Sequence, residues 1–229
     1  MVLHRQVGRR IFQLLAAAGL LTLAAAPFGQ WYLAWFGLAF WLIAVAESPT
    51  SRQAMLRGWL GGVLYFSMNI WWLWTASIPG TVVLVLYFSL YWGAAAGLLH
   101  RSGLLRTTVA IDGLSRSYDG TLGAKLSPVG CVLGVATTWV AFEWLRLNVV
   151  DGFPWLSLGV TQTPLPVMCQ VADWGGPAII SFWVALLNAF VTMAWIHRRE
   201  LARVKPAAAF VSCATTRIRT AIRSLPISV

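Results

Sequence analysis

The sequence has 229 residues, of which 59% are apolar and only 10% are charged. This composition excludes an ordinary soluble domain, in which about a quarter of the residues carry a charge. The net charge of +10 does not indicate a nucleic-acid-binding protein either, because the basic residues stand in short clusters between long apolar runs. The composition therefore predicts a membrane protein without a nucleic-acid partner.

A transmembrane helix needs about 20 mostly apolar residues to cross a hydrocarbon core of about 30 Å, because its backbone polar groups must be satisfied within the segment. We interpret six segments as such helices, and they cover residues 11–26, 31–46, 58–74, 81–99, 130–147 and 178–196. The expected fold is an all-α integral membrane protein, in which residues 1–197 form a bundle of about six transmembrane helices.

The first segment also has features of a secretory signal, namely a basic start and small residues before Pro27. A second apolar run follows after only a few residues, as in a tight helical hairpin. We therefore interpret the first segment as a membrane span.

The positions of Lys and Arg predict the orientation, because these residues are retained on the cytoplasmic side. With the N-terminus inside, every one of the 17 Lys and Arg residues except Arg146 falls on the inner side. Both termini are then cytoplasmic, and the connection at 148–175 faces outward. Residues 198–229 are expected to be a basic cytoplasmic tail, in which the apolar run AAAFVSC is too short to cross a bilayer.

Tryptophans gather near the predicted membrane boundaries, mostly on the outer side, at positions 31, 35, 71, 72, 74, 144, 155 and 174. An indole ring prefers the headgroup level, so an aromatic belt explains these positions. A second interpretation is that the outer tryptophans line a cleft for lipid. The sequence leaves both open.

Glu143 and Arg146 lie three residues apart near the outer end of the fifth predicted helix, so they share a helix face and can pair. Ionisable residues near a membrane span are costly unless they face the bundle or an aqueous cleft. They therefore indicate either a functional site or a pair that anchors the loop that follows.

The remaining polar residues predict no cofactor. Cys131, Cys169 and Cys213 have no paired spacing and no nearby histidine, which argues against a metal site and against a disulfide framework. We find no serine nucleophile elbow, phosphate loop or zinc motif.

The stretch EWLRLNVVDGFPWLSLG, residues 143–159, resembles the E-x-L-R and G-F-P-W-x-x-x-G signature of the membrane domain of bacterial apolipoprotein N-acyltransferases. The resemblance extends in consistent order over about residues 8–200. It includes APFGQWYLAWFGLAF in the first hairpin and GWLGGVLYFSMNIWWLWTA in the third span.

The resemblance implies a multi-pass enzyme of the bacterial inner membrane that transfers an acyl chain from phospholipid to the N-terminal cysteine of a diacylated lipoprotein. In this family the catalytic glutamate, lysine and cysteine belong to a nitrilase-like domain. None of the three has a counterpart here, so we assign no catalytic residue. The chain is expected to lack the catalytic domain and to be inactive alone, and KPAAAFV at 205–211 resembles the aborted start of a seventh helix.

Under this interpretation, the candidate residues for guiding lipid or lipoprotein are Glu143, Arg146, Gly152, Phe153, Pro154 and Trp155. Glycine permits positive φ and proline fixes its own φ, which suits a rigid turn with an aromatic tip. The expected partners are membrane phospholipid and lipoprotein. Two other hypotheses stay open: a lipid-binding subunit that partners a separately encoded nitrilase-like hydrolase domain, and a small transporter.

Overall fold

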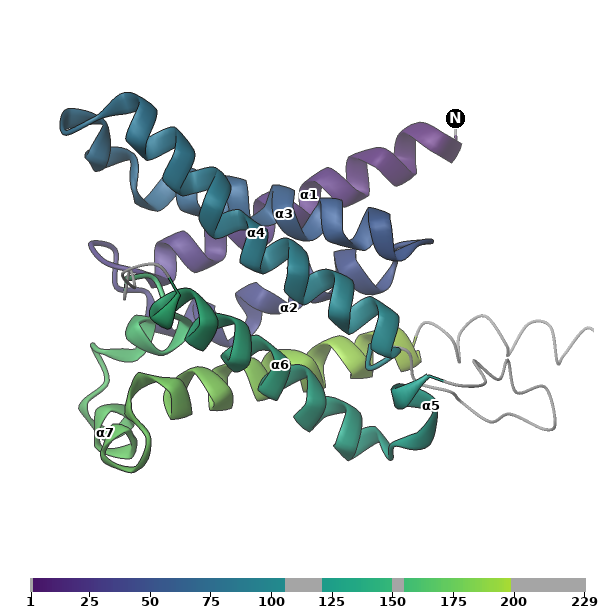
Figure 1. The fold of residues 1–229 in the computed structure, drawn as a ribbon. Coiled ribbons are helices and arrows are strands. Elements are labelled where there is room, and N and C mark those ends of the chain that lie inside the picture. Colours follow the sequence, from purple (N-terminus) through teal and green to yellow (C-terminus); the bar gives the residue numbers. More distant parts are fainter. Residues whose placement is uncertain (1, 106–120, 150–154, 199–229) are drawn as a thin grey trace, which may run out of the picture.

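The computed structural model of the chain describes residues 2–105, 121–149 and 155–198, and every regular element in these ranges is helical (Figure 1). Most of the predicted inner loop and the tail at 199–229 lie outside the described residues. The predictions about both segments therefore stay predictions.

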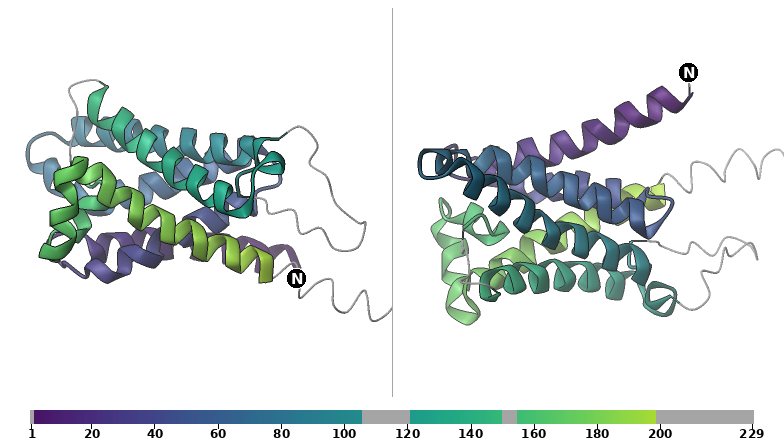
Figure 2. Two further views of the ribbon diagram at one scale, coloured as in Figure 1. Left: turned by 90° about the horizontal axis from the view of Figure 1, so that it is seen from below. Right: turned by 45° about the horizontal axis from the view of Figure 1, so that its top comes forward.

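Long helices that run back and forth build the bundle (Figures 1 and 2). They are α1 (Val2–Ala24), α2 (Ala34–Ala46), α3 (Ser51–Asn69), α4 (Ile78–Ser102), α6 (Pro128–Asn148) and a helix at Gly176–Arg198. The short elements are η1 (Trp31–Leu33), η2 (Trp71–Thr75), α5 (Leu122–Lys125), η3 (Leu158–Gln162), α7 (Pro166–Gln170) and η4 (Val171–Trp174).

Within the part of the chain that the structure describes, four helices are long and apolar enough to cross a membrane, and they cover Val7–Ala24, Ile78–Ser102, Pro128–Asn148 and Gly176–Arg198. The helix α2 has 13 residues and is therefore about 20 Å long, which is shorter than the hydrocarbon core. It lies at the centre of the bundle and packs on α1, α3 and α4.

The third predicted helix, 58–74, begins and ends later in the chain than the observed helix α3. The helix α3 begins at Ser51, where the Thr50 side chain accepts the backbone N–H of Gln53, and it ends at Asn69. The polar first turns were excluded from the prediction because they carry Arg52 and Arg57. The structure accommodates Arg57 inside the bundle, where its guanidinium donates to the Ala44 carbonyl at 2.9 Å.

Caps set the limits of the next two helices. Ser77 and Ser127 precede α4 and α6, and each side chain accepts a backbone N–H of the first turn. A proline follows each cap near the first helical position, where its missing N–H costs nothing. Gly103, with φ of 72°, ends α4 in the left-handed conformation that glycine adopts readily.

An aromatic cluster joins four helices at the centre of the core. Trp41 of α2, Trp92 of α4 and Trp139 of α6 meet edge to face, with ring centroids 5.1 to 5.5 Å apart. Tyr65 of α3 stacks on Trp92 at 5.2 Å. These large rings fix the spacing of α2, α3, α4 and α6, since edge-to-face pairs tolerate little displacement.

The two ends of the bundle differ in composition. One end carries η2, η3, α7 and η4, and we call it the tryptophan end after Trp71, Trp72, Trp74, Trp155 and Trp174. The other carries the first turns of α1 and α3, the end of α4, and α5. We call it the arginine end after Arg9, Arg10, Arg52, Arg57 and Arg101.

Candidate functional site

The helix α6 places Glu143 and Arg146 one turn apart on its buried face. Their exposed fractions are 8% and 3%, so both side chains face the bundle. A buried charged group must be hydrogen-bonded to avoid a large desolvation penalty. The partners of these two residues therefore define what the site does.

The Glu143 carboxylate binds three elements together. Its Oε1 accepts the indole N–H of Trp139 at 3.0 Å and the backbone N–H of Leu158 at 2.7 Å. The Ser181 hydroxyl, on the helix Gly176–Arg198, lies close enough to donate a further hydrogen bond. Glu143 thus holds the start of η3 between α6 and the last described helix.

Arg146 holds the residues just before η3. Its Nη1 donates to the Trp155 carbonyl at 2.9 Å. The guanidinium carbon lies 5.7 Å from the ring centroid of Phe66 and 5.6 Å from that of Phe88, so it makes cation–π contacts with α3 and α4. Arg146 therefore ties the outer connection to the α3–α4 pair as well as to α6.

The backbone between these two anchor points is strained. Leu156 has φ of 63°, in the left-handed region that costs a non-glycine residue about 1 kcal/mol or more. Arg146 fixes the carbonyl before this residue and Glu143 fixes the N–H two residues after it. The two charged side chains together stabilise a conformation that the sequence alone does not favour.

This arrangement presents the Trp155 ring at the tryptophan end. The ring is 52% exposed, and its centroid lies 5.2 Å from that of Trp72 in η2. The pair joins the connection after α6 to the connection between α3 and α4. Trp155 is thus positioned by a buried clamp, formed by Glu143 and Arg146, while its side chain stays accessible.

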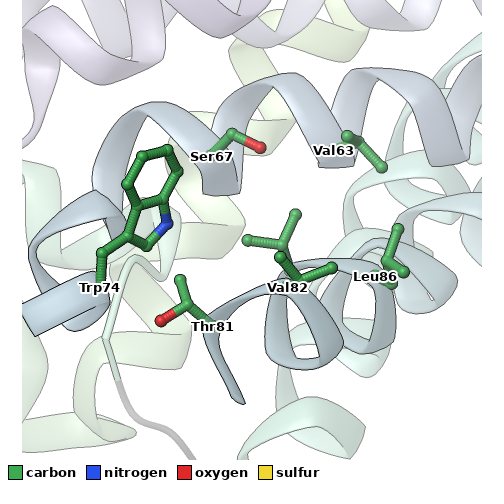
Figure 3. Close-up of a pocket in the computed structure, with 7 residues that line it drawn as sticks. Val63, Ser67, Trp74, Thr81, Val82 and Leu86 are labelled. Carbon is green, nitrogen blue, oxygen red and sulfur yellow. The ribbon is translucent and has the colours of Figure 1, made fainter. Parts of the chain in front are cut away.

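A groove opens between α3, η2 and α4 (Figure 3). Its volume is about 170 Å³, and it is lined by Val63, Ser67, Trp74, Thr81, Val82, Val85 and Leu86. Thr81 and Val85 are buried and form its floor, whereas Trp74, Val82 and Leu86 are exposed at its rim. The lining is mostly apolar, so the groove suits a hydrocarbon chain.

A second set of polar contacts fixes η3. The Gln162 amide donates to the Trp31 carbonyl at 3.0 Å, and its oxygen accepts the Trp35 indole N–H at 3.0 Å. The backbone N–H of Gly159 donates to the Ser181 hydroxyl at 2.7 Å. These bonds connect η3 to η1, α2 and the last described helix.

Sequence reasoning identified Glu143, Arg146 and Trp155, and the structure brings them together. Gly152, Phe153 and Pro154 lie outside the described residues, so the predicted GFPW turn stays a prediction. Sequence reasoning missed Trp139 and Ser181, and it named Trp72 only as a member of the outer tryptophan cluster. Trp139 was detectable, because it lies four residues before Glu143 on the same helix face, whereas Ser181 carries no local signal.

Both charged side chains hold other groups among the residues that the structure describes. The Glu143 carboxylate is occupied by N–H donors, and the Arg146 guanidinium donates to a carbonyl between two aromatic rings. Both side chains position the backbone of the outer connection, at the Trp155 carbonyl and the Leu158 N–H. The accessible features of the site are the aromatic rings and the groove.

Comparison with known families finds a match to the apolipoprotein N-acyltransferase N-terminal domain over residues 17–190. An apolipoprotein N-acyltransferase of Azotobacter vinelandii is 31% identical over 182 residues, which cover 77% of this chain and 32% of the relative. One of Pseudomonas putida is 31% identical over 211 residues, covering 88% of this chain and 36% of the relative. One of Vibrio parahaemolyticus is 29% identical over 186 residues, which cover 81% of this chain and 34% of the relative. The chain thus spans about a third of the length of these curated relatives.

Proposed function

The chain belongs to the apolipoprotein N-acyltransferase family, and from this membership we propose that it is the membrane-embedded part of an enzyme that acylates lipoproteins. The proposed reaction transfers an acyl chain from phospholipid to the N-terminal amino group of a diacylated lipoprotein. The observation that supports a role for this part is the apolar groove between α3 and α4. Its rim residue Trp74 belongs to η2, as does Trp72, whose ring contacts the clamped Trp155.

We assign the groove to one acyl chain of the phospholipid. Its volume of about 170 Å³ is below the roughly 300 to 1,000 Å³ of pockets that enclose a drug-sized ligand. It can therefore hold a segment of an acyl chain while the rest lies in the bilayer. The rim residue Trp74 lies two positions from Trp72, which contacts Trp155.

In this role, Trp155 guides substrate by its fixed position. A rigid ring that is half exposed at the membrane surface offers apolar area without the entropic cost of ordering a flexible side chain. Glu143 and Arg146 act through the backbone that carries Trp155, so they are positioning residues. We propose the same guiding role for Gly152, Phe153 and Pro154, which lie outside the described residues.

The proposed location is the bacterial inner membrane, crossed six times, with both termini in the cytoplasm. The presence of Val2 and Arg198 at the arginine end supports termini on one side of the membrane. The tryptophan end then faces outward, which agrees with the preference of indole rings for the headgroup level.

The groove assignment can be tested by photocrosslinking in bilayers. The chain is reconstituted with a phospholipid that carries a diazirine in one acyl chain, and labelled peptides are identified by mass spectrometry. We expect label on residues 74–86. Val82→Trp fills the groove and should reduce this label, whereas Val83→Trp adds the same ring at a neighbouring exposed position outside the lining. Equal labelling of both variants and the native chain would contradict the assignment.

Two further experiments separate the remaining hypotheses. If the chain is a lipid-binding subunit that partners a separate hydrolase domain, the groove should be labelled, and a pull-down of the chain from membranes should recover that domain. A small transporter would give solute-dependent flux in sealed vesicles, and the acyltransferase proposal predicts no such flux.

A further inference from the structure

The arginine end contains a cluster of positive charge that the proposed acyl-transfer function does not use. Arg9 and Arg10 come from α1, Arg57 comes from α3, and Glu47 is the residue that follows α2. Arg9, Arg10 and Glu47 each interact electrostatically with Arg57, and Arg9 also forms an ion pair with Glu47 at 2.9 Å. Among the side chains that the structure describes here, three cations and one carboxylate thus meet at the junction of three helices.

Arg57 is the most enclosed member of this cluster, with an exposed fraction of 8%. Its Nη1 donates to the Ala44 carbonyl at 2.9 Å, and this is its one hydrogen bond to the residues that the structure describes. A guanidinium carries five N–H donors in a planar fork, and two parallel donors match the oxygens of a phosphate. Arg57 therefore retains capacity for an anion.

Gln13 lies beside these charges with an exposed fraction of 6%. Its Nε2 donates to Glu47 Oε2 at 3.2 Å, which fixes the orientation of the amide, because the other orientation would place two acceptors together. Its Oε1 is buried and has no hydrogen-bond partner among the residues that the structure describes. A buried acceptor without a donor costs about 1 to 3 kcal/mol.

The single negative charge of Glu47 does not neutralise the three arginines. Its Oε2 accepts from Arg9 at 2.9 Å and from Gln13. The cluster therefore offers excess positive charge together with one unsatisfied acceptor. A ligand that complements both features carries an anionic phosphate and its own N–H or O–H donor.

We propose that this cluster, formed by Arg9, Arg10, Gln13, Glu47 and Arg57, binds a phosphate group that carries such a donor. Two sources share this chemistry. One is the headgroup of a phospholipid such as phosphatidylethanolamine, whose ammonium donates to Gln13 Oε1. The other is free dihydrogen phosphate, whose hydroxyl does the same. The site lies at the end of the bundle opposite the groove, so it stands independently of the acyl-transfer proposal.

Lipid retention by the purified chain tests the proposal. The chain is exchanged into detergent with phosphatidylethanolamine or phosphatidylcholine of equal acyl chains, and bound lipid is measured by native mass spectrometry. Phosphatidylcholine has the same phosphate but a headgroup without an N–H donor. We expect phosphatidylethanolamine to bind about tenfold more tightly, as one charge-assisted hydrogen bond implies.

Three variants separate the parts of the site. Arg57→Gln should weaken phosphatidylethanolamine about tenfold or more. Arg52→Gln removes the same charge from an exposed position on the same helix and should leave binding unchanged. Gln13→Leu keeps the arginines and should abolish the preference for phosphatidylethanolamine over phosphatidylcholine. Equal loss in Arg52→Gln and Arg57→Gln, or an unchanged preference in Gln13→Leu, would overturn the proposal.

Inorganic phosphate distinguishes the two sources. If millimolar phosphate displaces the retained lipid from the native chain and not from Arg57→Gln, the cluster is a site for the free anion. If phosphate does not displace the lipid while the Arg57→Gln loss is observed, the cluster is a headgroup site. If Arg57→Gln fails to fold, the half-buried Arg10→Gln replaces it, and unchanged lipid retention in that variant contradicts the proposal.

Discussion

The carboxylate of Glu143 accepts the backbone N–H of Leu158 across 2.7 Å, and so a side chain of α6 determines where η3 begins. The same oxygen accepts the Trp139 indole N–H, and Arg146 on the next turn holds the Trp155 carbonyl. The strained residue Leu156 lies between these fixed points. The position of the outer connection thus depends on two buried charges of one helix.

Glu143→Ala should destabilise the protein. The substitution leaves the Trp139 indole N–H and the Leu158 N–H buried without an acceptor, which costs about 3 kcal/mol in total. For a chain of this size, we expect the midpoint of thermal unfolding in detergent to fall by about 6 °C or more.

Glu143→Gln keeps one acceptor oxygen and should lose less stability than Glu143→Ala. Asp173→Asn is the matched control, because it neutralises an exposed carboxylate of the same outer connection and should leave the midpoint unchanged. Midpoints that fall equally for Glu143→Ala and Asp173→Asn would show that Glu143 does not hold η3.

Trp155→Ala should reduce acyl transfer without unfolding the membrane part. The readout is a chimera in which this chain replaces the matching part of a full-length relative, expressed in cells depleted of their own enzyme. The third acyl chain on lipoproteins is measured by mass spectrometry. Losing the ring contact with Trp72 and the guiding surface should lower triacylation about tenfold.

Trp174→Ala is the control for this variant, since Trp174 is 88% exposed on the same end of the bundle. If triacylation is unchanged in Trp155→Ala, the connection that carries Trp155 has a structural role and does not guide substrate. A chimera that is inactive with native Trp155 would instead count against the proposed function itself.

Gly58→Ala should weaken the packing of α3 against α4. An added Cβ would collide with the Ala96 methyl group and would lie 2.7 Å from the Trp92 carbonyl oxygen, which belongs to a helix backbone and cannot move aside cheaply. Overpacking of this kind costs about 1 to 3 kcal/mol. We expect a fall in the thermal midpoint in detergent.

Gly19→Ala provides the comparison, because a Cβ at this position in α1 meets nothing within 4 Å. Its midpoint should be unchanged or slightly raised, since alanine favours the helix. If Gly58→Ala is as stable as Gly19→Ala, close approach of α3 and α4 is not required for stability.

The sequence predicted the helices where apolar runs coincide with helix length, as for α4 and α6. It misplaced α3, because hydropathy treats Arg57 as a boundary residue. The structure places its guanidinium on a carbonyl of α2, a partner 13 residues earlier in the chain. The Thr50 cap that begins α3 can be recognised from the local sequence, but a hydropathy pattern does not include capping residues.

The candidate site was predictable to the extent that it is local. Helical spacing predicted the shared face of Glu143 and Arg146 but left open which way this face points, and the burial of both residues shows that it points inward. Their partners were not predictable, because Leu158, Ser181 and Phe88 come from other elements that only the folded bundle brings together. The position of Trp72 against Trp155 likewise depends on the α3–α4 connection.

The proposed orientation predicts opposite labelling of the two ends of the bundle in intact cells. In a background with Cys131→Ser, Cys169→Ser and Cys213→Ser, single cysteines are introduced as Trp174→Cys at the tryptophan end and Arg101→Cys at the arginine end, both at exposed positions. A maleimide that cannot cross the inner membrane should label only the first. After permeabilisation it should label both, which controls for reactivity. The physical reason is the retention of Lys and Arg on the cytoplasmic side, which places the arginine end inside. If only Arg101→Cys is labelled in intact cells, the proposed orientation is wrong, and the groove and Trp155 lie at the inner leaflet.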